Sequence, residues 1–132
     1  MTLDQIETAL GQRLEAMPAC PPIAWPNKDA PGTVPYLEFR HAPNTRRMPG
    51  ISGQGLPILD GILLVTVVAA RDKFTGPANA IAQAVADRFP QALRLTAGAG
   101  RVVITDASEF GQGFTDGTHY RQPVRIRYTT EG

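Results

Sequence analysis

The sequence ILDGILLVTVVAA, residues 58–70, decides the fold of this chain. Successive side chains of a β-strand point to opposite faces of the sheet, and here both faces are apolar. One face carries Leu63, Val65 and Val67, and the other carries Ile62, Leu64 and Val68. A strand that is apolar on both faces is a central strand, and both of its faces must be covered. In a chain of 132 residues helices can cover one face, so the second face indicates another layer or another subunit.

The residues that follow predict a helix packed against this strand. Thr75 is a suitable N-cap, Pro77 fits the first helical turn, where its missing N–H costs nothing, and Pro90 ends the helix. Its buried face consists of Ala78, Ile81, Ala82, Val85 and Phe89. Residues 2–17 predict a second amphipathic helix, which Thr2 and Gln5 open as a capping box. Its apolar stripe consists of Leu3, Ile6, Leu10, Leu14 and Met17.

Further segments have the alternation or the apolar character of β-strands. They are residues 23–26, residues 34–42, residues 93–95 and 101–105 around a glycine-rich turn, and residues 119–129. In the first of these, a short edge strand, Trp25 is expected to be a buried anchor. The predicted order is α-β-β-β-α-β-β, which indicates a single α+β domain over residues 1–132. We expect a mostly antiparallel sheet of four to five strands with both helices packed on one face.

The composition excludes several classes of protein. Thirteen basic and twelve acidic side chains leave a formal net charge of +1, which gives no long-range attraction to nucleic acid or to a membrane surface. The single cysteine, Cys20, cannot form an internal disulfide, which fits a reducing compartment. The longest apolar run, residues 62–70, is about half the length that a bilayer-spanning helix needs. We therefore expect a soluble protein that is made in the cytoplasm.

Two glycine-rich segments without periodicity are candidate binding loops. Residues 43–57 are long for an unstructured connection in a compact domain, and loops of this length tend to be functional. Its candidate assembly residues are Arg46, Arg47, Met48 and Ile51. We interpret this segment as one that becomes ordered against a partner, and a mobile hairpin tip is the alternative. In the second loop, residues 106–118, Phe110 and Phe114 are unusually apolar for an exposed tip.

The last predicted strand presents a stripe of arginines. Arg121, Arg125 and Arg127 share one face, and the apolar side chains of the strand lie on the other. In one interpretation the arginines form a solvated outer face, paired with Glu38 of a neighbouring strand. In the other they meet acidic groups of another protomer or face DNA in a lumen, since the guanidinium fork suits both. Together with Phe110 and Phe114, these arginines form a candidate interface with another subunit or another protein.

No arrangement of catalytic or metal-binding residues emerges from the sequence. The glycine cluster at residues 50–55 lacks the lysine and the following helix of a phosphate-binding loop. His41 and His119 lie in different strands without another ligand at metal-binding spacing. Neither Ser52 nor Ser108 lies in a nucleophile elbow. We therefore predict a protein that is not an enzyme and needs neither a metal nor a cofactor.

Five segments have a characteristic order along the chain. After the first helix and a proline-rich link come residues 23–25 (IAW), 34–39 (VPYLEF), 61–68 (GILLVTVV), 80–90 (AIAQAVADRFP) and 120–128 (YRQPVRIRY). In pattern and order the chain resembles the small tail terminator, or tail completion, proteins of long-tailed phages and of related prophage or gene-transfer particles. The resemblance covers nearly the whole chain and does not depend on a catalytic motif.

This resemblance implies a structural protein of the virion tail, made in the cytoplasm of a bacterial host. Such subunits form a homo-hexameric ring on the completed tail tube and are expected to be monomers when dilute. The ring stops polymerisation of the tail tube protein and offers a head-joining surface to the head–tail connector, and DNA only passes through its lumen. A long loop between the second and third strands takes shape on assembly, and residues 43–57 match this loop by position.

Two other functions stay open at the level of the sequence. One is a head–tail connector or stopper protein, which also forms rings from a small sheet. The other is a small cytoplasmic enzyme or ligand-binding domain, in which the loop with Phe110 and Phe114, together with His119, forms the wall of a pocket.

Overall fold

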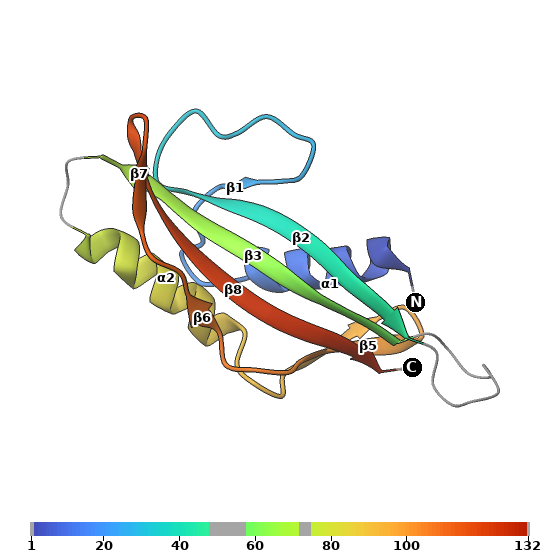
Figure 1. The fold of residues 1–132 in the computed structure, drawn as a ribbon. Helices are drawn as coiled ribbons and strands as arrows, with labels where there is room; N and C mark the ends of the chain where they lie inside the picture. Colours follow the sequence, from blue (N-terminus) through green and yellow to red (C-terminus); the bar gives the residue numbers. More distant parts are fainter. Residues whose placement is uncertain (1, 48–57, 72–74, 132) are drawn as a thin grey trace.

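The computed structural model describes residues 2–47, 58–71 and 75–131. Their elements are α1 (Leu3–Glu15), β1 (Ile23–Ala24), β2 (Tyr36–Arg47), β3 (Ile58–Ala70), α2 (Gly76–Arg88), β4 (Arg94–Ala97), β5 (Gly100–Ile104), β6 (Glu109–Phe110), β7 (Phe114–Asp116) and β8 (His119–Glu131). The strands form one twisted sheet, and both helices lie behind it on the same side (Figure 1). The predicted α+β class is confirmed.

The sheet is built around β3, as its sequence predicts. Both β2 and β8 run antiparallel to β3 along nearly its whole length. The strand order is β1-β2-β3-β8-β5-β4, and β6 and β7 also pair with β8. Because β6 and β7 pair with the edge of β8 that faces away from β3, they share with β5 and β4 the side of the sheet opposite to β1.

The predicted sheet of four to five strands and the order α-β-β-β-α-β-β are correct only in part. The described residues form eight strands, and β1 runs parallel to β2. The parallel pair arises because the connection through residues 25–35 carries the chain back before it enters β2. The additional strands β6 and β7 lie in residues 106–118, which were expected to be a loop. Segments of two and three residues are too short to show a strand periodicity in the sequence.

The two faces of β3 have different surroundings. On the helix side Leu63, Val65 and Val67 are fully buried and belong to the main core. On the outer side only Val68 is fully buried, in a small cluster with Ala24 and Tyr36. Thr66 on this side is also buried, whereas Ile62 and Leu64 are half-buried. The central position of β3 is thus confirmed, but its outer face is covered only in part within one chain.

The helices begin where the sequence predicts. In α1 the Gln5 N–H donates to Thr2 Oγ1 at 3.1 Å and the Thr2 N–H donates to Gln5 Oε1 at 3.0 Å, which completes the capping box. Leu3 was expected in the buried stripe but is 48% exposed, because it lies in the first turn beyond the edge of the core. Thr75 is the N-cap of α2, although its side chain makes no capping hydrogen bond.

Strand β2 is longer than predicted. It was expected to end at Ala42 but continues to Arg47, with a shift in register between Pro43 and Thr45. Such an irregularity lets a proline, which has no N–H to donate, lie within a paired strand. Residues 43–47 of the predicted loop therefore belong to β2, and residues 48–57 lie outside the described residues.

Candidate assembly surfaces

The predicted arginine stripe lies on the outer face of the sheet. Arg121 bridges two carboxylates, with its Nη1 at 2.7 Å from Glu38 Oε2 and its Nε at 3.0 Å from Asp116 Oδ2. Glu38 also contacts Arg40 at 2.6 Å. Burial disfavours the charge on Arg121 and is the largest single effect, but the hydrogen bond to Glu38 and the charges of Glu38 and Asp116 together outweigh it and raise the pKa of Arg121. The expected pairing of the stripe with Glu38 is thus found, across β3 rather than between adjacent strands.

The other two arginines of the stripe are more exposed. Arg127 Nε lies 2.9 Å from Glu109 Oε1, and this contact raises the pKa of Arg127. Arg125 is exposed and has no ion-pair partner among the residues that the structure describes. A shallow groove of about 410 Å³ on this face is lined by Glu38, Arg40, Leu64, Thr66, Phe114, Asp116, Arg121, Pro123 and Arg125. This arrangement offers apolar surface surrounded by charged groups, a composition typical of protein interfaces.

Phe110 and Phe114 are exposed, as predicted, although they lie in strands and not at a loop tip. Their side chains are 51% and 50% exposed, which makes them two of three large exposed apolar residues in the described part of the chain. Phe114 pairs with Arg121 and lies on the outer face, whereas Phe110 pairs with Val124 and lies on the helix side. Both therefore lie at the same border of the sheet, on opposite faces.

The other candidate assembly residues lie far from this border. Arg46 is exposed near the end of β2, where Arg46 and Arg47 pair with Leu59 and Ile58 at the start of β3. The arginine stripe begins at the other end of β3, where Val68 pairs with Arg121. Because the stripe extends along β8 to Arg127, which pairs with Ile62, Arg46 is far from Phe114 and Arg121 but not from Arg127. Met48 and Ile51 lie outside the described residues.

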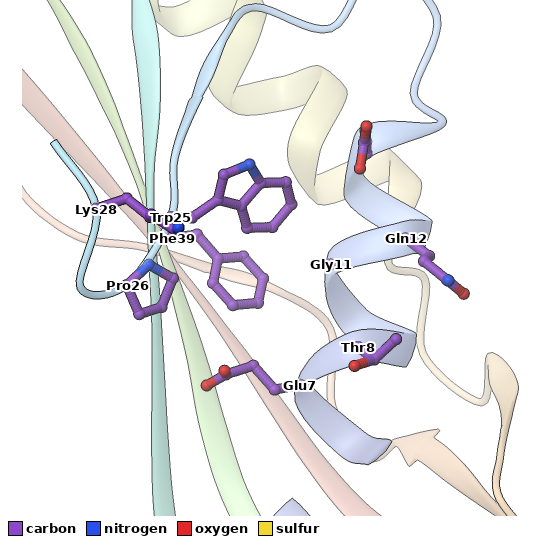
Figure 2. A pocket seen from close by; sticks show the side chains of 9 residues that line it. Glu7, Thr8, Gly11, Gln12, Trp25, Pro26, Lys28 and Phe39 are labelled. Atoms are coloured by element: carbon purple, nitrogen blue, oxygen red, sulfur yellow. The ribbon is translucent and has the colours of Figure 1, made fainter. Parts of the chain in front are cut away.

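A second groove, which the sequence did not predict, lies at the β1 border between α1 and the chain after β1. Figure 2 shows the rings of Trp25 and Phe39 facing Gly11 of α1, with Glu7, Thr8 and Lys28 around them. The ring centroids of Trp25 and Phe39 lie 5.3 Å apart. A Cβ atom at Gly11 would lie 3.0 Å from Trp25 Cζ3, so this glycine permits the close approach of helix and ring. The groove has a volume of about 300 Å³, and Trp25 is half-buried instead of being the fully buried anchor that we expected.

The structure also joins polar residues that no sequence spacing connects. His41 Nδ1 lies 3.4 Å from Glu7 Oε1, and His41 Nε2 contacts the Tyr128 hydroxyl on its other side. Gly61 leaves room for this hydroxyl, since a Cβ there would lie 2.5 Å from Tyr128 Oη. Burial lowers the pKa of His41, with Glu7 opposing, and burial raises the pKa of Tyr128 to about 12. This cluster connects α1 to β2 and β8, so we assign these three side chains a structural role.

The buried His41 predicts how stability depends on pH. Its pKa is lowered in the folded protein, so the unfolded chain binds a proton more readily between about pH 7 and 5. The free energy of unfolding is therefore expected to fall as the pH is lowered through this window. Urea titrations at pH 7.5, 6.5 and 5.5 measure the effect. The His41→Gln variant should show a smaller slope, and an equal slope in both proteins would contradict the assignment.

Other chemistry is not apparent in the described residues. No group of three or more His, Cys, Asp or Glu side chains there could hold a metal ion. The ring of His119 packs edge-on against Tyr36, with centroids 6.4 Å apart. None of the described helices is both long and apolar enough to cross a membrane. The two border surfaces are thus the main candidates for function.

The comparison with known families identifies the chain. A family model described as "Phage tail terminator protein" matches residues 5–128. The chain belongs to the phage tail terminator family. It is therefore a structural protein of the phage tail, and its place is in the virion. The resemblance seen in the sequence is confirmed.

Two solved structures share the fold of this terminator. One, which carries no functional name, has a TM-score of 0.80 and 22% identity, and the alignment covers 100% of this chain and 97% of that chain. The other is a chain from the virion of a native gene transfer agent (GTA) particle, with a TM-score of 0.67, 19% identity and coverage of 96% and 95%. No curated protein matches the sequence.

Proposed function

We propose that this protein forms a closed homo-hexameric ring on the end of the completed tail tube, where it stops polymerisation and presents the head-joining surface. The match to the tail terminator family over residues 5–128 carries this proposal. A terminator must bind the growing end as the next tube subunit would, and then expose a different surface. The protein therefore needs one surface for its own copies, one for the tube and one for the connector.

The composition of the outer face of the sheet favours a subunit that assembles with other proteins. Ile62 and Leu64 of the central strand stay half-buried there, beside the exposed Phe114 and Arg125. Leu64 and Phe114 line the shallow groove there next to charged side chains, a composition that fits a protein interface. We assign this face with its arginine stripe, and Phe110 at the same border on the helix side, to contacts with other protomers or with the tube.

The end of β2 is the proposed assembly loop. Arg46 and Arg47 close the strand, and the candidate residues Met48 and Ile51 follow in the connection to β3. Because this end of the sheet lies away from Phe114 and Arg121, it can contact a different partner. We propose that this end of the sheet takes part in forming the ring and contacts the rim of the tube.

The proposal is tested with the tail tube protein that the same genome encodes. Tubes polymerised with this protein present should be shorter and carry a ring at one end in negative-stain electron micrographs. Tubes without it should have bare ends and a broad distribution of lengths. A protein that leaves tube ends bare but binds the purified connector would instead be a connector or stopper protein, and the capping function would be rejected.

A further inference from the structure

The groove between α1 and Trp25 has the chemistry of a binding site for a paired aromatic ring and cation. Its floor is formed by Trp25, Phe39 and the bare backbone at Gly11. On its rim α1 places two carboxylates, Glu7 and Glu15, one on each side of Gly11. Glu15 is exposed and has no ion-pair partner among the described residues. Lys28 also lines the groove and Glu7 contacts His41, but the two carboxylates against one lysine leave the rim net negative. An apolar floor next to such a rim favours a ligand that brings an apolar ring together with a positive charge.

The same chain carries such a pair at the opposite border of its sheet. Phe114 is 50% exposed on β7, opposite Arg121, and the exposed Arg125 lies further along β8, opposite Glu109. Both side chains line the shallow groove of the outer face. With the strand order β1-β2-β3-β8 and β7 beyond β8, the sheet separates this pair from the groove of its own chain. The pair can therefore reach only the groove of another molecule.

We infer that Phe114 and Arg125 of one protomer dock into the Trp25 groove of a second copy of this chain, with Arg125 facing Glu7 and Glu15. The contact joins two different surfaces, so it is heterologous and can repeat around a closed ring. It rests on the proposed ring and names the residues that close it.

The open border of β2 fits this arrangement. On the edge away from β3, β1 pairs only with Leu37 and Glu38, so the rest of the described β2 edge has no strand partner. This edge continues beside a second cavity of about 470 Å³ that Trp25, Phe39 and Arg40 help to line. Long open edges invite pairing with other chains and are usually covered or blocked. A neighbouring protomer that docks at the Trp25 groove also shields this edge.

Two variants that each disable one surface test the contact. The double variant Phe114→Ser/Arg125→Glu removes the docking pair, and Thr8→Arg/Glu15→Arg blocks the groove through exposed positions of α1. Each alone should remain monomeric, by sedimentation equilibrium, at concentrations where the unmodified protein forms rings. Their mixture should give a 1:1 dimer and nothing larger, because each molecule keeps one intact surface. Circular dichroism checks that both variants are folded.

Trp25 reports on the groove directly, because it is the only tryptophan of the chain. Its emission is expected to move to shorter wavelength when the unmodified protein assembles and when the two variants are mixed. Leu3→Ser is the control, since Leu3 is similarly exposed at 48% but does not line the groove. This control should assemble as the unmodified protein does.

Three results would overturn the inference: assembly by either double variant alone, no dimer in the mixture, or an unmodified protein that stays monomeric with constant Trp25 emission. Failure of the contact and failure of the proposed function are distinguishable. If the unmodified protein caps tubes while Phe114→Ser/Arg125→Glu still forms rings, the contact is wrong and the function stands. If the mixture gives the dimer but tubes grow unchanged, the contact stands and the capping function is wrong.

Discussion

A Val65→Asp variant is expected to lose its fold. Val65 is 0% exposed in the middle of β3, between β2 and β8 and beneath the helices. An aspartate there would bury a carboxylate among apolar side chains, or would have to take up a proton to stay inside. Substitutions of this kind cost more than ~4 kcal/mol, which is comparable to the whole stability of a small domain. Far-ultraviolet circular dichroism with urea titration should show no cooperative transition.

Leu64→Asp is the matched control on the same strand. Leu64 lies on the outer face, half-buried, and pairs in register with Arg40 on β2 and Arg125 on β8. A carboxylate at this position has water and two guanidinium groups nearby, so the variant should still unfold cooperatively. If Val65→Asp and Leu64→Asp were equally stable, our assignment of a buried inner face and a partly covered outer face to β3 would be wrong.

The second large effect concerns tube capping. The double variant Arg46→Glu/Arg47→Glu should fold normally, since exposed substitutions usually change stability by less than ~0.5 kcal/mol, and Arg46 is exposed. The reversed charge at the end of β2 is expected to abolish ring formation or tube capping. Tube lengths measured with the variant present should equal those of tubes grown without any terminator.

The control for this experiment is Arg94→Glu/Arg101→Glu, which makes the same change of charge on β4 and β5. These arginines contact Glu131 at 3.6 and 4.0 Å, and exposed pairs of this kind contribute little to stability. Capping should be retained. A folded Arg46→Glu/Arg47→Glu variant that caps tubes normally would show that this end of β2 has no role in assembly.

Regular patterns in the sequence predicted the main elements correctly. The two-sided apolar segment placed β3 at the centre, because only a central strand buries both faces. The alternation of residues 119–129 correctly separated the buried Val124, Ile126 and Tyr128 from the arginines. Thr2 and Gln5 correctly marked the start of α1, since a capping box is a purely local signal.

Features that depend on distant parts of the chain could not be predicted from the sequence. His41 meets Glu7 and Tyr128 only because β2 and β8 flank β3 and α1 crosses behind them. The groove at Trp25 likewise needs α1 beside the chain after β1, with Gly11 at the point of contact. Strands β6 and β7 exist because the long border of β8 offers hydrogen bonds to short segments. None of these has a local signature.

The separation of the surfaces agrees with the function we propose. The Trp25 groove and the Phe114 border lie on opposite sides of the sheet, and the end of β2 lies away from Phe114 and Arg121. A ring subunit uses two opposite sides for its neighbours and has other surfaces left for the tube and the connector. The framework of β2, β3 and β8 holds these surfaces apart at fixed positions.

Renewed growth of capped tubes tests the central claim most directly. Preformed tubes are incubated with this protein, and the unbound protein is then removed. Fresh tube protein that carries a label visible by electron microscopy is added. The account predicts that no labelled tube extends from the ends that carry a ring, while untreated tubes lengthen. Labelled tube growing from the ringed ends would contradict it.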